Sequence, residues 1–207
     1  MSPNYRKLIL LVGLFITALT TSNIISTKIF MIGGIALTVG IVAYPITFLI
    51  SDTISEVWGK RTARQMVMAG LFANIVMLIL LYFARILPPA PFWPNQEAFD
   101  LILGGVPRVV LASLLAYIVS QTYDVWSFHY WKDKTSGKHL WLRNNASTMV
   151  SQLLDSIIFV TVAFYGLMPN EAVLSMITVQ YIVKFGIALI DTPFCYALVN
   201  WAKKEEL

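Results

Sequence analysis

Two five-residue stretches of the chain, "SQTYD" and "SQLLD", each place an amide and a carboxylate three positions apart. In the first, Gln121 lies beside Asp124 on one face of an α-helix, because residues three apart are neighbours there. In the second, Gln152 lies beside Asp155 in the same way. An amide with a carboxylate offers two donors and several acceptors within one reach. Such a pair binds a polar guest rich in hydrogen bonds, or it joins one helix to another, and both alternatives stay open.

Carboxylic acids recur inside or at the edges of long apolar segments. The five are Asp52, Glu56, Asp124, Asp155 and Asp191. Lys184 is the only basic residue placed at a comparable depth. A charge at the centre of a bilayer costs about 2.5–3.5 kcal/mol on insertion scales. Since one ammonium cannot neutralise five acids, we expect some of them to be protonated, hydrated or waiting for a ligand, which predicts a wet binding site.

The candidate residues divide into two groups. For substrate binding we predict Asp155, Gln152, Asp191, Lys184, Gln121 and Asn23, and for the pathway or coupling we predict Asp52, Glu56 and Asp124. Asn23 is equally compatible with helix capping or a helix contact. Glu56 is also compatible with a simple interfacial pair to Lys60, four residues later on the same helical face.

No enzyme motif accompanies these residues. The chain contains no His-Glu-x-x-His, no Gly-x-Ser-x-Gly and no P-loop, so neither catalysis nor ATP hydrolysis is expected. Cys195 is the single cysteine, which excludes an internal disulfide and a cysteine-based metal cluster. We predict no metal and no cofactor. The net charge of +4 does not indicate nucleic acid, because the basic residues cluster where apolar segments end.

The elements that carry these residues are membrane spans. Of the 207 residues, 57% are hydrophobic and only 13% are charged, whereas soluble domains carry about 25% charged residues. Apolar runs of about 20 residues, enough to cross a bilayer as helix, recur along the chain. We predict an all-α integral membrane protein that forms one transmembrane domain over 1–207. Its six helices are expected at about 8–28, 34–57, 65–87, 105–128, 145–167 and 172–200, with a short surface helix near 95–103.

Basic residues indicate the orientation of the spans. With both termini in the cytoplasm, the inner side holds eleven of them: Arg6, Lys7, Lys60, Arg61, Arg64, Lys132, Lys134, Lys138, Arg143, Lys203 and Lys204. The outer side holds Lys28, Arg85 and Arg108. An excess of lysine and arginine in cytoplasmic loops is the usual determinant of topology. We therefore predict cytoplasmic N and C termini.

Four stretches, in this order along the chain, carry a family resemblance. They are "ISDTISEVWGKRTARQ" (50–65), "GGVPRVVLASLLAYIVSQTYDV" (104–125), "LRNNASTMVSQLLDSIIF" (142–159) and "VKFGIALIDTPF" (183–194). Together they resemble the queuosine precursor transporter family, also known as the VUT family of vitamin uptake transporters. The resemblance implies six helices, the bacterial inner membrane and import of two 7-deazaguanines, 7-cyano-7-deazaguanine (preQ0) and 7-aminomethyl-7-deazaguanine (preQ1).

The implied substrate suits the polar residues. A guanine-type edge presents the N1–H and 2-amino donors, which one carboxylate accepts side by side, and an O6 that accepts from an amide or from Lys184. We expect Asp155 or Asp191 on this edge, in a solitary carrier or facilitator that needs only its substrate and the lipid bilayer. Whether the chain forms a homodimer stays open.

The alternative is the substrate-binding S-component of an energy-coupling-factor vitamin importer, an architecture that the six helices resemble. Such a subunit works with an ATPase module. Its usual contact signature, Ala-x-x-x-Ala in the first helix, is absent from "LILLVGLFITALTTSNIIS", so a solitary carrier is favoured.

Overall fold

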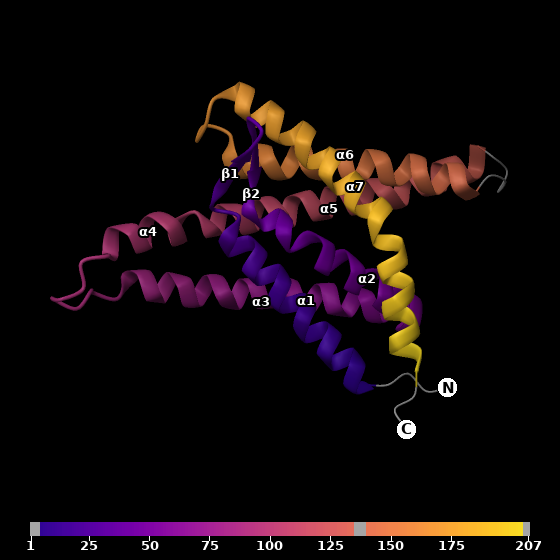
Figure 1. The fold of residues 1–207 in the computed structure, drawn as a ribbon, viewed down its shortest axis with the longest axis horizontal. Coiled ribbons are helices and arrows are strands. Elements are labelled where there is room, and N and C mark those ends of the chain that lie inside the picture. The colour runs from indigo at the N-terminus through magenta and orange to yellow at the C-terminus, as the bar shows by residue number, and fades with distance from the viewer. Residues whose placement is uncertain (1–4, 135–139, 205–207) are drawn as a thin grey trace. The chain divides into compact units, whose positions relative to one another are not determined.

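The computed structural model describes residues 5–134 and 140–204, except for the side chains of 124–125, 128–129, 131–133, 140–148, 188–189 and 191–192. Its elements, labelled in Figure 1, are α1 (Tyr5–Ile25), β1 (Ile29–Ile32), β2 (Ile35–Thr38), the 3-10 helix η1 (Val39–Val42), α2 (Tyr44–Trp58), α3 (Lys60–Ile86), α4 (Gln96–Gly104), α5 (Val106–Lys134), α6 (Leu140–Phe164) and α7 (Asn170–Lys203). The chain is therefore mostly helical, as expected for an all-α membrane protein.

A β-hairpin interrupts the helices where the second span was expected to begin. Strands β1 and β2 pair through a two-residue turn at Gly33 and Gly34, whose φ angles are +59° and +83°. A type I′ hairpin turn requires positive φ at both positions, which glycine adopts at no steric cost. Helix α2 consequently starts at Tyr44 instead of residue 34.

A single residue separates α2 from α3. Gly59 has a φ of +87°, a left-handed conformation that ends one helix and lets the chain turn into the next. The predicted break over 58–64 is therefore only one residue long, and α3 begins at Lys60. At the other end of the chain, α7 begins at Asn170, directly after Pro169 and two residues before the predicted start at 172, and continues to Lys203 with Pro193 inside it.

Three stretches of helix are long and apolar enough to cross a bilayer: Tyr5–Ile25, Lys60–Ile86 and Gln96–Tyr123, and a shorter apolar segment covers Met149–Phe164. Their outer faces are apolar too. On α3, for example, the side chains of Phe72, Ile79 and Leu80 are 67%, 51% and 63% exposed. In water such a face would be unfavourable, so these side chains are suited to contact lipid.

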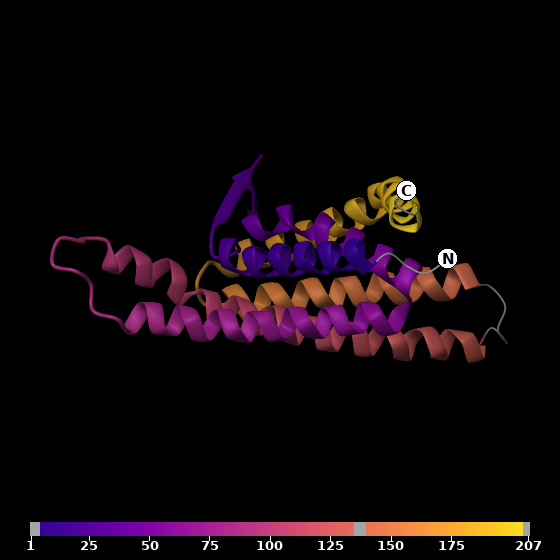
Figure 2. The ribbon, with the colours of Figure 1, turned by 90° about the horizontal axis from the view of Figure 1, so that it is seen from below.

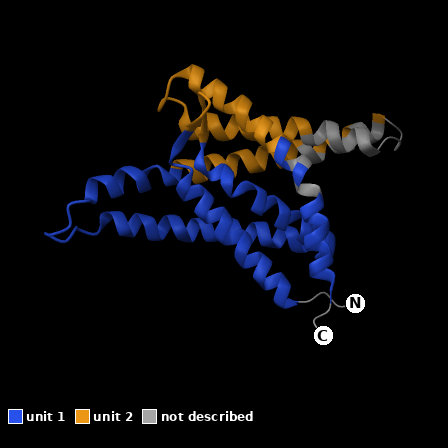
Figure 3. Ribbon diagram, viewed as in Figure 1, with its two compact units in different colours: residues 1–30, 38–107, 186–207 blue, residues 31–37, 108–185 orange. Residues whose placement is uncertain are grey.

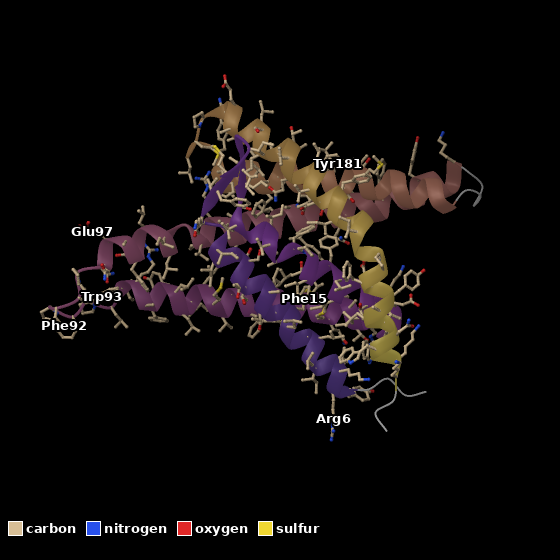
Figure 4. All side chains as sticks on the ribbon, viewed as in Figure 1. Arg6, Phe15, Phe92, Trp93, Glu97 and Tyr181 are labelled. Carbon is tan, nitrogen blue, oxygen red and sulfur yellow. The ribbon has the colours of Figure 1, made fainter. Side chains whose placement is uncertain are left out.

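The described residues form two compact units (Figure 3). Unit 1 comprises 1–30, 38–107 and 186–207, and unit 2 comprises 31–37 and 108–185. In unit 1, α1, α2 and α3 pack against one another. Its apolar cluster takes Leu11 and Phe15 from α1 and Ile50 and Ile54 from α2; Phe15 is labelled in Figure 4.

Two polar contacts tie other segments into unit 1. Helices α3 and α4 run side by side from the loop that joins them (Figures 1 and 2), and Arg85 Nε donates to the Asp100 carboxylate at 3.0 Å. At the opposite end, Lys7 Nζ donates to the backbone carbonyls of Trp201 and Lys204 at 2.9 and 2.6 Å. Lys7 is only 5% exposed and lies 5.0 Å from the centre of the Trp201 ring. The ammonium therefore caps the C-terminal end of α7, where the helix dipole favours positive charge.

Unit 2 is built on α5, α6 and the first half of α7. Its apolar cluster joins Ala112 of α5, Val160 and Phe164 of α6, and Val173 and Met176 of α7. The small Ala112 allows α5 to approach closely. Arg108 donates to the carbonyls of Val162 and Tyr165 at 2.7 and 2.6 Å. These carbonyls belong to the last turn of α6 and the residue after it, so Arg108 satisfies acceptors that a helix end leaves unpaired.

Candidate functional site

The most buried charged pair in the described residues joins α6 to α7 within unit 2. Lys184 Nζ donates a hydrogen bond to Asp155 Oδ2. The Lys184 side chain is 3% exposed and the Asp155 side chain 24%. The lysine is thus enclosed, whereas the carboxylate keeps an open edge. A carboxylate has about four lone-pair positions, so the bond to Lys184 leaves Asp155 with capacity to accept further donors.

The register of α6 against α7 explains why these two residues meet. The loop between the helices is short, so they run antiparallel. Phe164 and Val160 share one apolar cluster with Val173 and Met176. Asp155 lies five residues before Val160 on α6, and Lys184 lies eight residues after Met176 on α7. Because the helices are antiparallel, both positions lie further from the loop, and the face of Asp155 comes opposite Lys184. The seam is therefore apolar at the end near the loop and polar beyond it.

Further polar side chains lie at the polar end of the seam. Gln152 shares the helical face of Asp155, is partly buried and takes part in interactions of its own. Ser156 is fully buried, and its hydroxyl donates to the Gln152 carbonyl at 3.0 Å. The sequence-predicted trio of Gln152, Asp155 and Lys184 is thus brought together by two helices.

Gln180 also lies at the polar end of the α6–α7 seam, although it was not predicted from the sequence. It is 6% exposed and lies one turn before Lys184 on the same face of α7. The signal was present in "ITVQYIVKF", where Gln180 and Lys184 are four residues apart and therefore share a helical face. Tyr181, the next residue, marks this part of α7 in Figure 4.

The repeat of the motif on α5 is less well defined. Gln121 lies in unit 2 with an exposed side chain. The side chain of Asp124 lies outside the described residues. The predicted roles of Gln121 in binding and of Asp124 in the pathway stay predictions.

The remaining candidates belong to unit 1. Asn23 is 5% exposed and its Nδ2 donates to Asn74 Oδ1 at 2.8 Å, while Asn74 donates to the Gly70 carbonyl at 3.0 Å. This buried bond joins α1 to α3, so Asn23 makes the helix contact that the sequence left open as an alternative. Asn74 was not singled out from the sequence, because no spacing rule relates it to Asn23.

The two acids of α2 are exposed. Glu56 forms an ion pair with Lys203 of α7 at 3.6 Å, with side chains 65% and 53% exposed. Its partner in the structure is therefore not Lys60. Asp52 is exposed and takes part in an interaction of its own. For Asp191 the structure describes the backbone in α7 but not the side chain.

The side chains of this arrangement are suited to binding. In the described residues no group of three or more histidine, cysteine, aspartate or glutamate side chains is arranged to hold a metal ion. What the α6–α7 seam offers is one carboxylate with open acceptor positions, an enclosed ammonium that balances its charge, and two amides. Such a set recognises a neutral or cationic molecule through directed hydrogen bonds.

Comparison with known proteins shows where the chain belongs. Residues 38–198 match the family described as "Putative vitamin uptake transporter". The chain belongs to the VUT family of queuosine precursor transporters. A relative from Bacillus subtilis (strain 168), named "Probable queuosine precursor transporter", is 35% identical over 94% of this chain and 86% of its own length.

Two further relatives carry similar names. The "Queuosine precursor transporter" of Escherichia coli (strain K12) is 27% identical over 79% of this chain and 72% of its own length. The "Probable queuosine precursor transporter" of Haemophilus influenzae is 28% identical over 61% of this chain and 51% of its own length. No solved structure matches the chain at a significant level. As a VUT family member with several apolar helices, the chain is a multi-pass protein of the bacterial inner (plasma) membrane.

Proposed function

We propose that this chain imports queuosine precursors, preQ0 and preQ1, into the bacterial cytoplasm. The observation that carries the proposal is the 35% identity to a named queuosine precursor transporter over 94% of the chain. The polar end of the α6–α7 seam supports it with a chemically suitable site. The relative defines the class of solute, and the seam suggests how that solute is held.

In this proposal Asp155 is the residue that recognises the base. The open edge of its carboxylate accepts N1–H and one hydrogen of the 2-amino group of a 7-deazaguanine, two donors that lie side by side. Lys184 compensates the charge of Asp155, so that the ionised carboxylate is tolerated in a largely buried place. Gln152, three residues before Asp155 on the same helical face, contacts the rest of the base in this proposal.

We further propose a solitary carrier or facilitator of six spans with cytoplasmic termini. Helix α2 alone is 15 residues long, about 22 Å of helix. This is less than the roughly 30 Å of a hydrocarbon core, so the second crossing needs η1 or neighbouring residues as well. In this proposal Asp52, Glu56 and Asp124 line the cytoplasmic exit or the floor of the pocket.

The decisive experiment is uptake of labelled preQ0 and preQ1. The host is a bacterial strain that neither makes these bases nor has its own transporter for them, with and without this chain. We expect uptake, and queuosine in tRNA, only in cells that carry the chain. Repeating the measurement after collapse of the proton gradient separates a coupled carrier from a facilitator.

Absence of uptake in cells that hold the chain in their membrane would overturn the proposal. Co-purification with an ATPase, and uptake only when that ATPase is present, would replace the solitary mode with an energy-coupled one. Uptake of adenine in place of the deazaguanines would leave a carrier but contradict the assignment of Asp155 to a guanine-type edge.

A further inference from the structure

Two enclosed side-chain atoms in the described part of the chain have no hydrogen-bond partner: Trp58 Nε1 and Gln180 Oε1. Buried polar atoms are paired in the large majority of cases, so each exception requires an explanation. Trp58 packs against the apolar cluster of unit 1, where nothing indicates a polar ligand. Gln180 lies instead within unit 2, beside the Asp155–Lys184 pair.

The buried face of α7 shows how Gln180 is placed. Val173, Met176, Gln180 and Lys184 are 6%, 0%, 6% and 4% exposed and follow one another at three or four residues. Gln180 is thus one helical turn, about 6 Å, from both Met176 and Lys184. Its amide lies at the boundary between the apolar cluster and the ion pair.

A purely structural role does not explain an amide at this boundary. An apolar side chain of similar length would fill the same volume without leaving an acceptor unpaired, as Met176 does one turn away. Ser156, the buried polar residue of α6 on this seam, shows the contrast, because its hydroxyl is satisfied within its own helix by the Gln152 carbonyl. Only Gln180 Oε1 is left in need of a donor among these groups.

We propose that Gln180 Oε1 accepts a hydrogen bond from the transported base and so helps to determine its specificity. The inference rests on the proposed function and deepens it. If Asp155 accepts N1–H and one hydrogen of the 2-amino group, the second amino hydrogen remains, and Gln180 takes it. The oxygen is enclosed in this conformation, so the base reaches it when the polar end of the α6–α7 seam opens.

The unpaired Gln180 Oε1 makes the seam less stable when no base is bound to it. The closed, empty conformation carries an unsatisfied acceptor, and binding of the base removes this defect. A site with a buried acceptor also rejects a compound that lacks the matching donor, because the acceptor then stays unpaired. Gln180 would therefore discriminate between a primary and a substituted 2-amino group.

The test uses Gln180→Met, which keeps the length of the side chain and removes the acceptor. Ser156→Ala is the matched control, since it removes a buried polar group whose bond is local. Uptake of labelled preQ0 is measured with and without its N2-methyl derivative as competitor. Thermal unfolding of each purified protein in detergent is measured without substrate.

We expect Gln180→Met to unfold at the same or a higher temperature than the wild type while preQ0 uptake falls about tenfold or more. We also expect the wild type to prefer preQ0 over the N2-methyl derivative, and Gln180→Met to lose most of this preference. Ser156→Ala should keep both the uptake and the preference.

Three results would overturn the inference. A lower unfolding temperature for Gln180→Met would mean that the oxygen is already satisfied, by a bound water for instance. Unchanged uptake and preference in Gln180→Met, with an active wild type, would remove Gln180 from the site and leave the proposed function intact. An inactive wild type would overturn the proposed function itself.

Discussion

Lys184 donates a hydrogen bond to Asp155 and thereby joins α7 to α6 by an ion pair at the polar end of their seam. This pair supplies the counter-charge for Asp155, one of the five acids found inside or at the edges of apolar segments. A second of these acids, Glu56, is paired with Lys203. The excess of acids inferred from the sequence is therefore smaller in the structure, and the case for a binding site depends on the local arrangement around Asp155 instead of on the overall imbalance.

The first prediction separates the structural from the binding role of this pair. Asp155→Asn should lower the stability of the protein by about 3–5 kcal/mol, because it leaves the enclosed Lys184 without its carboxylate. The double variant Asp155→Asn/Lys184→Gln should recover much of this loss, because it removes both charges. Thermal unfolding in detergent measures the recovery.

Uptake then decides the role of Asp155. We expect the double variant to insert, to fold and to carry no preQ0, since asparagine presents an NH2 donor where one of the two acceptor oxygens for the guanine-type edge stood. Uptake by the double variant at the wild-type rate would limit the pair to a structural role.

The second prediction concerns Asn23 and Asn74. Asn23→Leu should destabilise the protein by about 1–3 kcal/mol, because it leaves the buried Asn74 Oδ1 without its donor. Uptake per molecule of folded protein should be nearly unchanged, since the Asn23 amide is engaged between α1 and α3. A fully stable Asn23→Leu that has lost uptake would return Asn23 to the substrate site.

The third prediction concerns the exposed pair of Glu56 and Lys203. Glu56→Gln should change stability by less than about 1 kcal/mol, because exposed ion pairs contribute little. If Glu56 belongs to the cytoplasmic pathway, uptake should fall nevertheless. Unchanged uptake in this variant, with Asp52→Asn measured in parallel, would remove Glu56 from the pathway.

The fourth prediction tests the cap at the end of α7. Lys7→Met removes the hydrogen bonds to the Trp201 and Lys204 carbonyls and should cost about 1–3 kcal/mol. Lys204→Ala is the control, because it keeps the backbone carbonyl that Lys7 binds. Equal unfolding temperatures for the two variants would contradict the cap.

Much of the fold follows from short-range pattern. Apolar runs predict the helices, and the start predicted for the sixth span, at about 172, lies two residues from the start of α7 at Asn170. The hairpin could have been predicted from the adjacent Gly33 and Gly34 between two apolar runs. The second strand, 35–38, was instead assigned to the start of a helix, because periodicity alone does not distinguish a short apolar strand from a helix start.

The partners within the site were harder to predict, because they depend on the register between helices. The sequence identifies Lys184 as the deep base, but only the packing of α6 on α7 selects Asp155 from five acids. Lys7 was counted only among the basic residues of the inner side, but it is buried, with its ammonium near the Trp201 ring and bonded to two carbonyls. Asn74, 51 residues from Asn23, was beyond any local rule.

The bond between Lys7 and the last turn of α7 has a consequence for the topology of the whole chain. Because residues 194 and 197 positions apart are in direct contact, we expect Lys7 and Lys204 to lie at the same surface of the lipid. This contact predicts an even number of crossings, whichever helices make them. Reporter proteins fused to either end of the chain should accordingly always report the same compartment.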